Sequence, residues 1–253
     1  MLNLERQAKI LELLEEYGKV EVPDLSRRLS ASEVTIRKDL KELDGRGLLR
    51  RAHGGAVRAV TVGADPSLQI KAALHAEEKR RIGAAAAALV GDGESIILDS
   101  GTTTQQIARH LKRRRGLKVI TNALNVATEL TGAEEVEVIL LGGILRQNSA
   151  SLVGQFAEEM LRHFSVDKLF LAVDGVDLEF GLSTPNLDES RVNQTMVGVA
   201  RETILVADSS KFGRRSLSRI VALKEVNKIV TDGGLSEAMR SGLRELGIEL
   251  VIA

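Results

Sequence analysis

Residues 32–43 carry an apolar stripe and a basic stripe at helical spacing, and this pattern restricts the fold more than any other part of the chain. Ser32 can accept the first free backbone N–H groups and start a helix. At about 100° per residue, three apolar side chains fall on one side: Ile36, Leu40 and Leu43. The opposite side carries Val34, Lys38 and Lys41. The apolar side must face a core, so the basic side points outward, as in a helix that reads the major groove of DNA.

The neighbouring segments predict a winged helix-turn-helix. Residues 4–17 have leucine and isoleucine at helical spacing, Gly18 ends that helix, and Val20 and Val22 indicate a short extended piece. Pro23 suits the first turn of a second helix that runs to Ser30. After the third helix, residues 48–55 form a basic ribbon with turns at 45–47 and after 51.

Charge supports this interpretation locally. The whole chain has 35 basic and 35 acidic residues, so its net charge gives no general attraction to nucleic acid. Residues 26–58 contain nine Lys or Arg and four Asp or Glu, a surplus of five, whereas residues 1–25 contain three and six. The basic residues therefore concentrate in the expected DNA-binding part, although a solvated charged face would have the same composition.

Composition excludes several classes of protein. The 43% hydrophobic content can supply a sizeable core, and the absence of cysteine excludes disulfides, thiolate metal sites and thiol nucleophiles. The six aromatic residues, five Phe and one Tyr, are too few for single-strand binding by base stacking. No apolar run is long enough to span a bilayer, and the charged amino terminus does not resemble a secretion signal, so we expect a cytoplasmic protein without membrane contact.

The chain is expected to divide into a DNA-binding domain at 1–57, a linker at 58–76 and a larger domain at 77–253. Breaker residues at 63–67 mark the linker. Beyond it, helix-like segments (77–90, 103–113, 123–130, 152–163, 186–200 and 235–246) precede strand-like ones (95–98, 117–121, 136–141, 168–173, 203–207 and 249–252). This alternation predicts an α/β fold with a mostly parallel sheet covered by helices on both faces.

Polar residues gather where these predicted strands end. Ligands of open α/β sheets bind outside the carboxyl ends of the strands. The first strand is followed by a loop that could cradle a phosphate with hydroxyls and free helix N–H groups, or could be an ordinary capped turn: Asp99, Ser100, Gly101, Thr102, Thr103 and Thr104. The next strand ends contribute Thr121, Asn122, Gly142, Gly143, Asp174, Gly175 and Lys211. Together they predict a site for a small anionic ligand.

The run from Arg6 to Ala56, above all residues 34–40 and 48–56, resembles the amino-terminal domain of the DeoR family of bacterial repressors. The loops at 99–104, 121–122, 142–143, 173–175, 181–186 and 208–213 are similar to those of the family's sensor domain, in the same order. The resemblance implies that the larger domain shares its fold with ribose-5-phosphate isomerases, glucosamine-6-phosphate deaminases and CoA transferases. The resemblance implies a repressor of sugar or nucleoside catabolic genes that a phosphorylated sugar releases from DNA.

The resemblance also implies roles for individual residues. The loop from Ser100 to Thr104 would hold the phosphate, Asp174 and Lys211 would hydrogen-bond the sugar, and Glu189 would line the same mouth. No cofactor is expected besides this effector.

The alternatives to a regulator are two classes of enzyme, an isomerase and a metal-dependent enzyme. A sugar-phosphate isomerase with an extra helical domain could use Asp99, Asp174 or Glu189 as base and Lys211 as the cation that steadies an enediolate. An isomerase, however, has no use for the amino-terminal domain. A metal-dependent enzyme is disfavoured because the four histidines are scattered without ligand spacing, so no metal site is expected.

For a DNA-binding protein, Arg37 and Lys38 are best placed to contact guanine edges or phosphates. Val34 could meet a thymine methyl or pack partly buried, and Ser32 and Thr35 should contact DNA at the helix start. Sequence-independent attraction is expected from Lys41, Arg50, Arg51 and His53. One such module makes a small interface, so we expect a homodimer or higher homo-oligomer on a double-stranded operator with paired half-sites.

Overall fold

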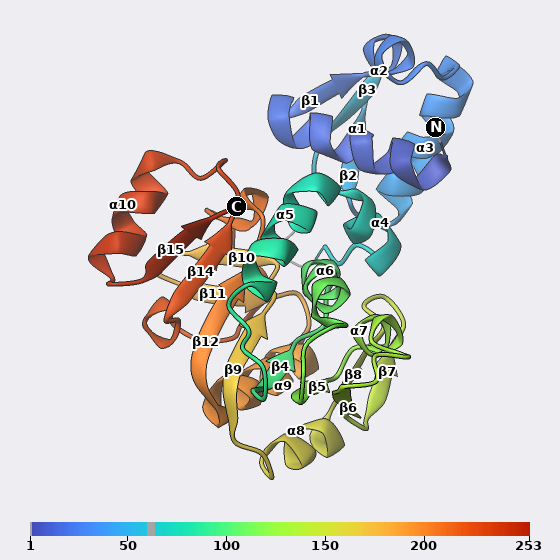
Figure 1. Ribbon diagram of the computed structural model, residues 1–253. Coiled ribbons are helices and arrows are strands. Elements are labelled where there is room, and N and C mark those ends of the chain that lie inside the picture. The colour runs from blue at the N-terminus through green and yellow to red at the C-terminus, as the bar shows by residue number, and fades with distance from the viewer. Residues whose placement is uncertain (1, 60–63) are drawn as a thin grey trace. The chain divides into compact units, whose positions relative to one another are not determined.

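The structure, a computed structural model, describes residues 2–59 and 64–253 and divides into two compact units (Figure 1). The first unit ends at Ala76 and the second begins at Glu77. Within the described residues, no helix combines the length and apolar character needed to cross a bilayer.

The first unit has the predicted order of helix, strand, helix, turn, helix and ribbon. Its elements are α1 (Asn3–Tyr17), β1 (Lys19–Glu21), α2 (Val22–Leu29), α3 (Glu33–Gly45), β2 (Leu49–Ala52), β3 (Gly55–Arg58) and α4 (Leu68–Ala73). β3 pairs antiparallel with both β1 and β2, so the ribbon continues a three-stranded sheet. Val22 begins α2 rather than extending β1, and Pro23 is tolerated beside it because a residue in the first helical turn needs no N–H partner.

The apolar stripe of α3 lies in the core of this unit, as predicted. Ile36, Leu40 and Leu43 are buried with Ile10 of α1 and Leu25 of α2. These buried side chains pack the three helices of the winged helix-turn-helix against one another.

The structure differs from the predicted linker at residues 58–76. Arg58 belongs to β3, and α4 places Ile70 and Leu74 in the core of the first unit against α1. His75 adds a backbone N–H to Glu12 Oε1 at 2.9 Å. Gly63 of the predicted breaker cluster lies outside the described residues. Apolar burial, which the irregular sequence pattern did not reveal, therefore joins residues 68–76 to the first unit.

The second unit is built on a seven-stranded parallel sheet, which confirms the predicted fold class. The strands, in their order across the sheet, are β15 (Glu249–Ile252), β14 (Lys228–Thr231), β12 (Ala200–Val206), β9 (Val166–Leu171), β4 (Ser95–Leu98), β5 (Leu117–Thr121) and β6 (Val136–Leu140). Every neighbouring pair is parallel. β14 was not predicted.

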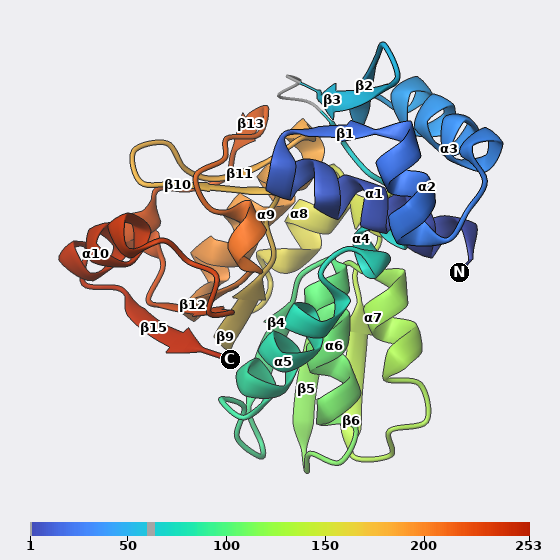
Figure 2. The same cartoon turned by 90° about the horizontal axis from the view of Figure 1, so that it is seen from above.

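Helices cover both faces of this sheet (Figure 2). One face packs against α5 (Ala76–Ala87), α6 (Thr102–Leu111) and α7 (Leu124–Glu129). The other packs against α8 (Gln155–Leu161), α9 (Leu187–Val199) and α10 (Glu237–Glu245). Neighbouring residues of a strand serve opposite faces: Ile96 and Leu98 face the first set and Ile97 faces the second.

Two small antiparallel sheets stand beside the main one. They are the hairpin of β7 (Ile144–Arg146) with β8 (Ser151–Val153), and the sheet of β10 (Gly175–Asp177), β11 (Gly181–Thr184) and β13 (Ser218–Arg219). The predicted helix at 152–163 is therefore shorter, since its first residues form β8 and α8 begins only after Gly154.

The order of the strands fixes where a ligand can enter. From β4 the chain proceeds outward through β5 to β6, then returns to the other side of β4 as β9 and proceeds to β12. The loops after β4 and β9 therefore leave the carboxyl edge of the sheet in opposite directions, and open α/β sheets bind ligands in the crevice between such loops.

Candidate DNA-contact surface and effector site

The start of α3 is built to expose short polar side chains. Ser32 is the N-cap, and its Oγ accepts the Thr35 N–H at 3.2 Å. The two hydroxyls, Ser32 Oγ and Thr35 Oγ1, lie 2.9 Å apart. Val34 is 75% exposed, which excludes a buried packing role for it within the chain.

The basic face of α3 points to solvent as predicted. Arg37 donates to Glu33 Oε2 at 2.6 Å, one turn back on the same helix. Lys38 and Lys41 are exposed. An exposed ion pair of this kind contributes little to stability, so Arg37 can exchange Glu33 for a DNA acceptor at small cost.

The ribbon presents the second group of predicted contacts. Arg50 and Arg51 lie on β2 and His53 lies in the turn before β3, and all three are exposed. The Arg51 backbone N–H donates to Asp44 Oδ1 at 3.2 Å, which fixes the ribbon against the end of α3.

An ion pair that was not predicted from the sequence joins α1 to the buried side of α3. Arg6 of α1 contacts Asp39 of α3 through both oxygens, with Nε–Oδ2 at 2.5 Å and Nη2–Oδ1 at 3.2 Å. Gln7 Nε2 donates to Glu42 Oε2 at 2.7 Å one turn further. Asp39 faces the core side of a helix whose other face is basic, so its burial could have been inferred from the same helical spacing.

The loop after β4 occupies the crevice. Asp99 is buried, and its carboxyl accepts N–H groups from Ser100 at 2.6 Å and from Ala172, after β9, at 3.2 Å. Asp99 therefore joins the two strands that flank the switch in strand order. Gly101 has φ +152°, and a Cβ there would lie 3.2 Å from Ala172 Cβ. This close turn needs glycine.

The three threonines start α6 directly behind this loop. Thr102, Thr103 and Thr104 are buried, and Thr104 Oγ1 donates to Gly101 O at 3.2 Å. Asn125 of α7 also donates to Gly101 O, at 2.9 Å. The Thr104 hydroxyl thus supports the turn, and the amino terminus of α6, with its partial positive charge, follows this loop.

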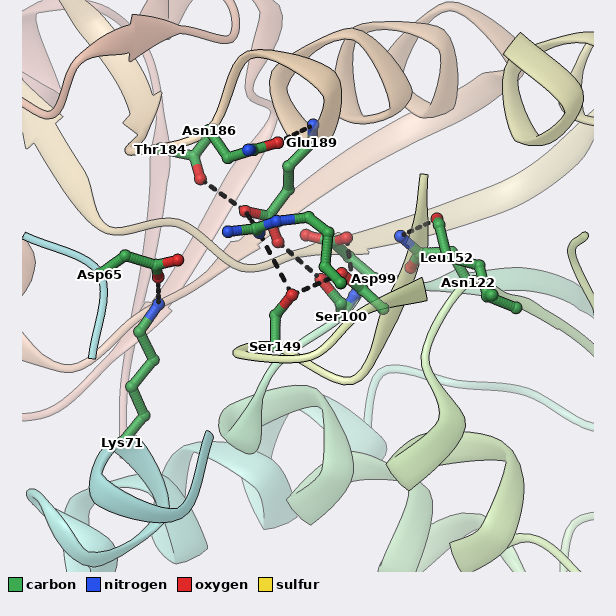
Figure 3. Close-up of polar contacts among 12 residues, drawn as sticks. Asp65, Lys71, Asp99, Ser100, Asn122, Ser149, Leu152, Thr184, Asn186 and Glu189 are labelled. Atoms are coloured by element: carbon green, nitrogen blue, oxygen red, sulfur yellow. Dashed lines mark hydrogen bonds and ion pairs between the residues drawn. The ribbon is translucent and has the colours of Figure 1, made fainter. Parts of the chain in front are cut away.

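Glu189 links three segments across the crevice (Figure 3). Its Oε1 accepts from Ser100 Oγ at 3.1 Å, and its Oε2 accepts from Thr184 Oγ1 at 2.9 Å and from Arg146 Nη1 at 2.6 Å. Asn186 caps the helix that carries Glu189. Arg146 Nη1 also donates to Ser149 Oγ at 3.2 Å, in the turn of the β7–β8 hairpin.

The site holds a carboxyl group with a shifted pKa. Burial raises the pKa of Asp99 to about 8, and the negative charge of Glu189 adds to this effect, although the N–H groups of Ser100 and Ala172 oppose it. Folding therefore favours the protonated form of the Asp99 carboxyl group relative to the unfolded chain.

The predicted pair of Asp174 and Lys211 meets on the β9 side. Lys211 Nζ lies 3.7 Å from Asp174 Oδ1. Asp208 caps the short 3₁₀ helix that carries Lys211 and accepts the Ser210 N–H at 3.2 Å. Gly175, next to Asp174, begins β10.

Other predicted residues have structural partners. Thr121 Oγ1 accepts the Ala123 N–H at 3.1 Å within the loop after β5, and Asn122 Nδ2 donates to Leu152 O at 3.2 Å, so Asn122 holds the β7–β8 hairpin. Gly143, at φ +144°, allows close strand approach, because a Cβ there would lie 2.6 Å from Val153 O. Gly142 is exposed just before it.

Four residues that complete this site were not predicted as site residues from the sequence. They are Arg146, Ser149, Thr184 and Asn125. Gly143 and Gly154 bracket the hairpin and were the available signal for it, but Leu152 and Val153 were assigned to a helix and residues 144–151 to no element.

Comparisons with known proteins agree with this arrangement. Residues 6–62 match the DeoR-like helix-turn-helix domain, and residues 74–233 match the DeoR C terminal sensor domain. The chain is 42% identical over 250 residues to a "Putative aga operon transcriptional repressor" of Escherichia coli O157:H7, covering 98% of this chain and 93% of that protein. The chain belongs to the DeoR family of transcriptional regulators. It is also 39% identical to "HTH-type transcriptional regulator GlpR" of Haloferax volcanii, covering 99% and 98% of the two chains.

Membership in the DeoR family confirms the predicted domain types: a DNA-binding helix-turn-helix and a carboxy-terminal sensor domain. The relatives that match nearly the whole chain are transcriptional regulators, so the isomerase alternative is set aside. Among solved structures, a ribose 5-phosphate isomerase from Plasmodium falciparum matches with TM-score 0.40 and 13% identity over 54% of this chain and 52% of that chain. A probable sor operon regulator from Shigella flexneri matches with TM-score 0.44 and 11% identity over 68% and 88%. Both scores are low, and no property of the site follows from them.

Proposed function

We propose that this DeoR-family regulator represses genes of sugar or nucleoside catabolism and that a phosphorylated sugar releases it from DNA. The observation that carries the proposal is the polar cluster at the carboxyl edge between β4 and β9. Ser100, Glu189 and the start of α6 converge there, with Asp174 and Lys211 on the β9 side. Hydroxyls, helix N–H groups and a lysine suit a phosphate, and the carboxyl groups suit sugar hydroxyls.

A thermal-shift screen of phosphorylated pentoses and hexoses tests the effector. A ligand that binds only the folded state raises the melting temperature according to its concentration and affinity. The dephosphorylated sugars serve as matched controls and should give smaller shifts. The absence of a shift with every sugar phosphate at millimolar concentration would contradict the proposal.

Coupling between the two domains is tested by reciprocity. If the effector lowers the affinity for operator DNA by some factor, operator DNA must lower the affinity for the effector by the same factor. Titrating the effector found in the screen with and without a duplex from the regulator's own promoter measures both numbers. Equal effector affinities in the two titrations would exclude the proposed switch.

The DNA contacts of α3 are expected to read sequence. We predict that Lys38→Ala weakens binding to the promoter duplex by roughly tenfold to a hundredfold, because one good contact to a base edge contributes about 1–3 kcal/mol. Fluorescence anisotropy with specific and random duplexes gives the ratio. Lys9→Ala is a matched control, since Lys9 is exposed on α1 and pairs with Glu12 at 2.9 Å. Equal losses in both variants would contradict a specific role for Lys38.

The ribbon contacts are expected to be electrostatic. Arg50→Ala should weaken binding to any duplex and lower the dependence of log affinity on log salt by about one unit. Arg51 and His53 belong to the same group, as does Lys41 on α3. A changed sequence preference with an unchanged salt dependence would contradict this assignment for Arg50.

We further propose that the chain acts as a homo-oligomer on paired half-sites, because a single helix-turn-helix buries too little surface for tight specific binding. Sedimentation equilibrium of the full chain checks the assembly, and a monomer at micromolar concentration with and without DNA would contradict it.

A further inference from the structure

The cations at the crevice already face carboxylates of the same unit. Arg146 contacts Glu189 at 2.6 Å, and Lys211 lies 3.7 Å from Asp174. The first pair is the tighter and more buried, with side chains that are 13% and 11% exposed. An anion that enters the crevice must therefore compete with these carboxylates.

Arg146 is linked to the expected phosphate loop through Glu189. Glu189 bridges the two, since one of its oxygens accepts from Arg146 and the other from Ser100 in that loop. Thr184 and Ser100 can keep Glu189 hydrogen-bonded if the guanidinium turns away. A planar guanidinium also binds phosphate with two parallel hydrogen bonds, which is stronger and more directional than a lysine contact.

The hairpin that carries Arg146 is anchored through β8, the strand that does not contain this arginine. The Leu152 N–H donates to Asn122 O at 2.7 Å, Asn122 Nδ2 returns a bond to Leu152 O, and Leu124 N–H donates to Ala150 O at 2.9 Å. These bonds fix β8 to the loop after β5. β7 pairs with β8 through the backbone, whereas the guanidinium of Arg146 donates to Ser149 and Glu189, so the guanidinium can change partner without breaking the backbone anchor of the hairpin.

We infer that Arg146 is a phosphate-recognising residue of the effector site and that the effector binds by taking its guanidinium from Glu189. This inference rests on the proposed function. It adds the residue Arg146, the exchange of its partner from Glu189 to the phosphate, and the direction in which each variant changes phosphate affinity. Glu189 is a competitor of the anionic part of the ligand, and it sets the affinity by holding Arg146 when the effector is absent.

The test compares three variants of the full-length protein: Arg146→Gln, Glu189→Gln and the double variant. Inorganic phosphate is the first probe because it carries the charge without a sugar, with chloride at equal ionic strength as its control. The second probe is the sugar phosphate with the largest thermal shift in the screen, with its dephosphorylated sugar as control. Arg201→Gln is the matched control variant. Arg201 is 78% exposed at the amino end of β12, whereas the proposed site lies at the carboxyl ends of the strands.

The variants should change affinity in opposite directions. Glu189→Gln is expected to tighten phosphate binding severalfold, because it removes both the competitor and a negative charge beside the anion. Arg146→Gln is expected to weaken it by roughly tenfold to a hundredfold. Since the single Arg146 variant leaves Glu189 without this cation and can unfold, the double variant decides. Its two neutral amides can bond each other, so it should melt near the wild-type temperature and still bind phosphate at least tenfold more weakly.

The outcomes separate the two ideas. If the wild type responds to sugar phosphates and the folded double variant responds equally, the role of Arg146 is refuted and the proposed function stands. Weaker phosphate binding by Glu189→Gln would refute the exchange of partners. If the wild type responds to no phosphate compound, the proposed function fails and this inference fails with it.

Discussion

Replacing Asp39 by alanine should lower the stability of the first unit by about 1.5–3 kcal/mol, because it removes the charge-assisted hydrogen bonds that the guanidinium of Arg6 donates to this buried carboxylate. Asp39 is 1% exposed and contacts Arg6 through both carboxylate oxygens. Folded domains are stable by only about 5–15 kcal/mol, so this loss is a large fraction of the total. Because the pair joins α1 to α3, binding to promoter DNA should fall with the folded fraction.

The single tyrosine makes this change measurable in the full chain. The protein has one Tyr and no Trp, and Tyr17 ends α1, so tyrosine fluorescence in urea follows the first unit alone. Arg6→Met with Asp39→Leu should recover much of the loss, since apolar residues can replace a buried pair. Glu33→Ala is the control: it removes an exposed pair with Arg37 and should cost less than about 1 kcal/mol. A loss below that limit in Asp39→Ala would refute the structural importance of the buried pair.

The stability of the second unit should fall as pH rises from about 4 to about 8, because of Asp99. The folded-state pKa is raised from 3.8 to about 8, first by burial and then by Glu189. Between these values the folded protein holds a proton that the unfolded chain releases, so the free energy of unfolding falls as pH rises. The contribution is fully present below the unfolded pKa and is lost as pH rises through the folded pKa. The slope reaches at most about 1.4 kcal/mol per pH unit.

Urea unfolding followed by circular dichroism at pH 6 and pH 8.5 checks the slope. Asp99→Asn should remove most of it, although the amide loses one of the two acceptors used by Ser100 and Ala172, which adds a cost that is independent of pH. Asp177→Asn is the control with the opposite shift: Arg215 lowers the pKa of Asp177, so this group is ionised throughout the range. An unchanged slope in Asp99→Asn would rule out a proton held on this residue.

Most of the fold could be predicted from the sequence. Helical spacing identified the buried side of α3 through Ile36 and Leu40, and strand–helix alternation located six of the seven strands of the parallel sheet. β14 was missed because the connection from β12 carries two 3₁₀ turns and β13 where the other crossovers carry an α-helix. A segment of four residues without a preceding helix leaves no periodic signal.

The site was predicted in part. Strand ends were informative because parallel strands bring their carboxyl ends to one edge, and Asp99 and Ser100 lie there, directly after β4. Arg146 could not be found in this way, since it lies on a short hairpin outside the main sheet and meets Glu189 across 43 residues of sequence. The register of β7 with β8, which places Arg146 opposite Ser151, is set by tertiary contacts.

The docking of α4 on α1 determines where the chain can be cut. A fragment that stops after β3 would lack Leu74 and the fully buried Ile70. The apolar surface of α1 that these two side chains cover would then be exposed to water. Such a piece would tend to self-associate through that bare surface, and its behaviour on DNA would mislead. An excised headpiece that retains residues up to Ala76 keeps this cover and is the shorter form suited to study by NMR.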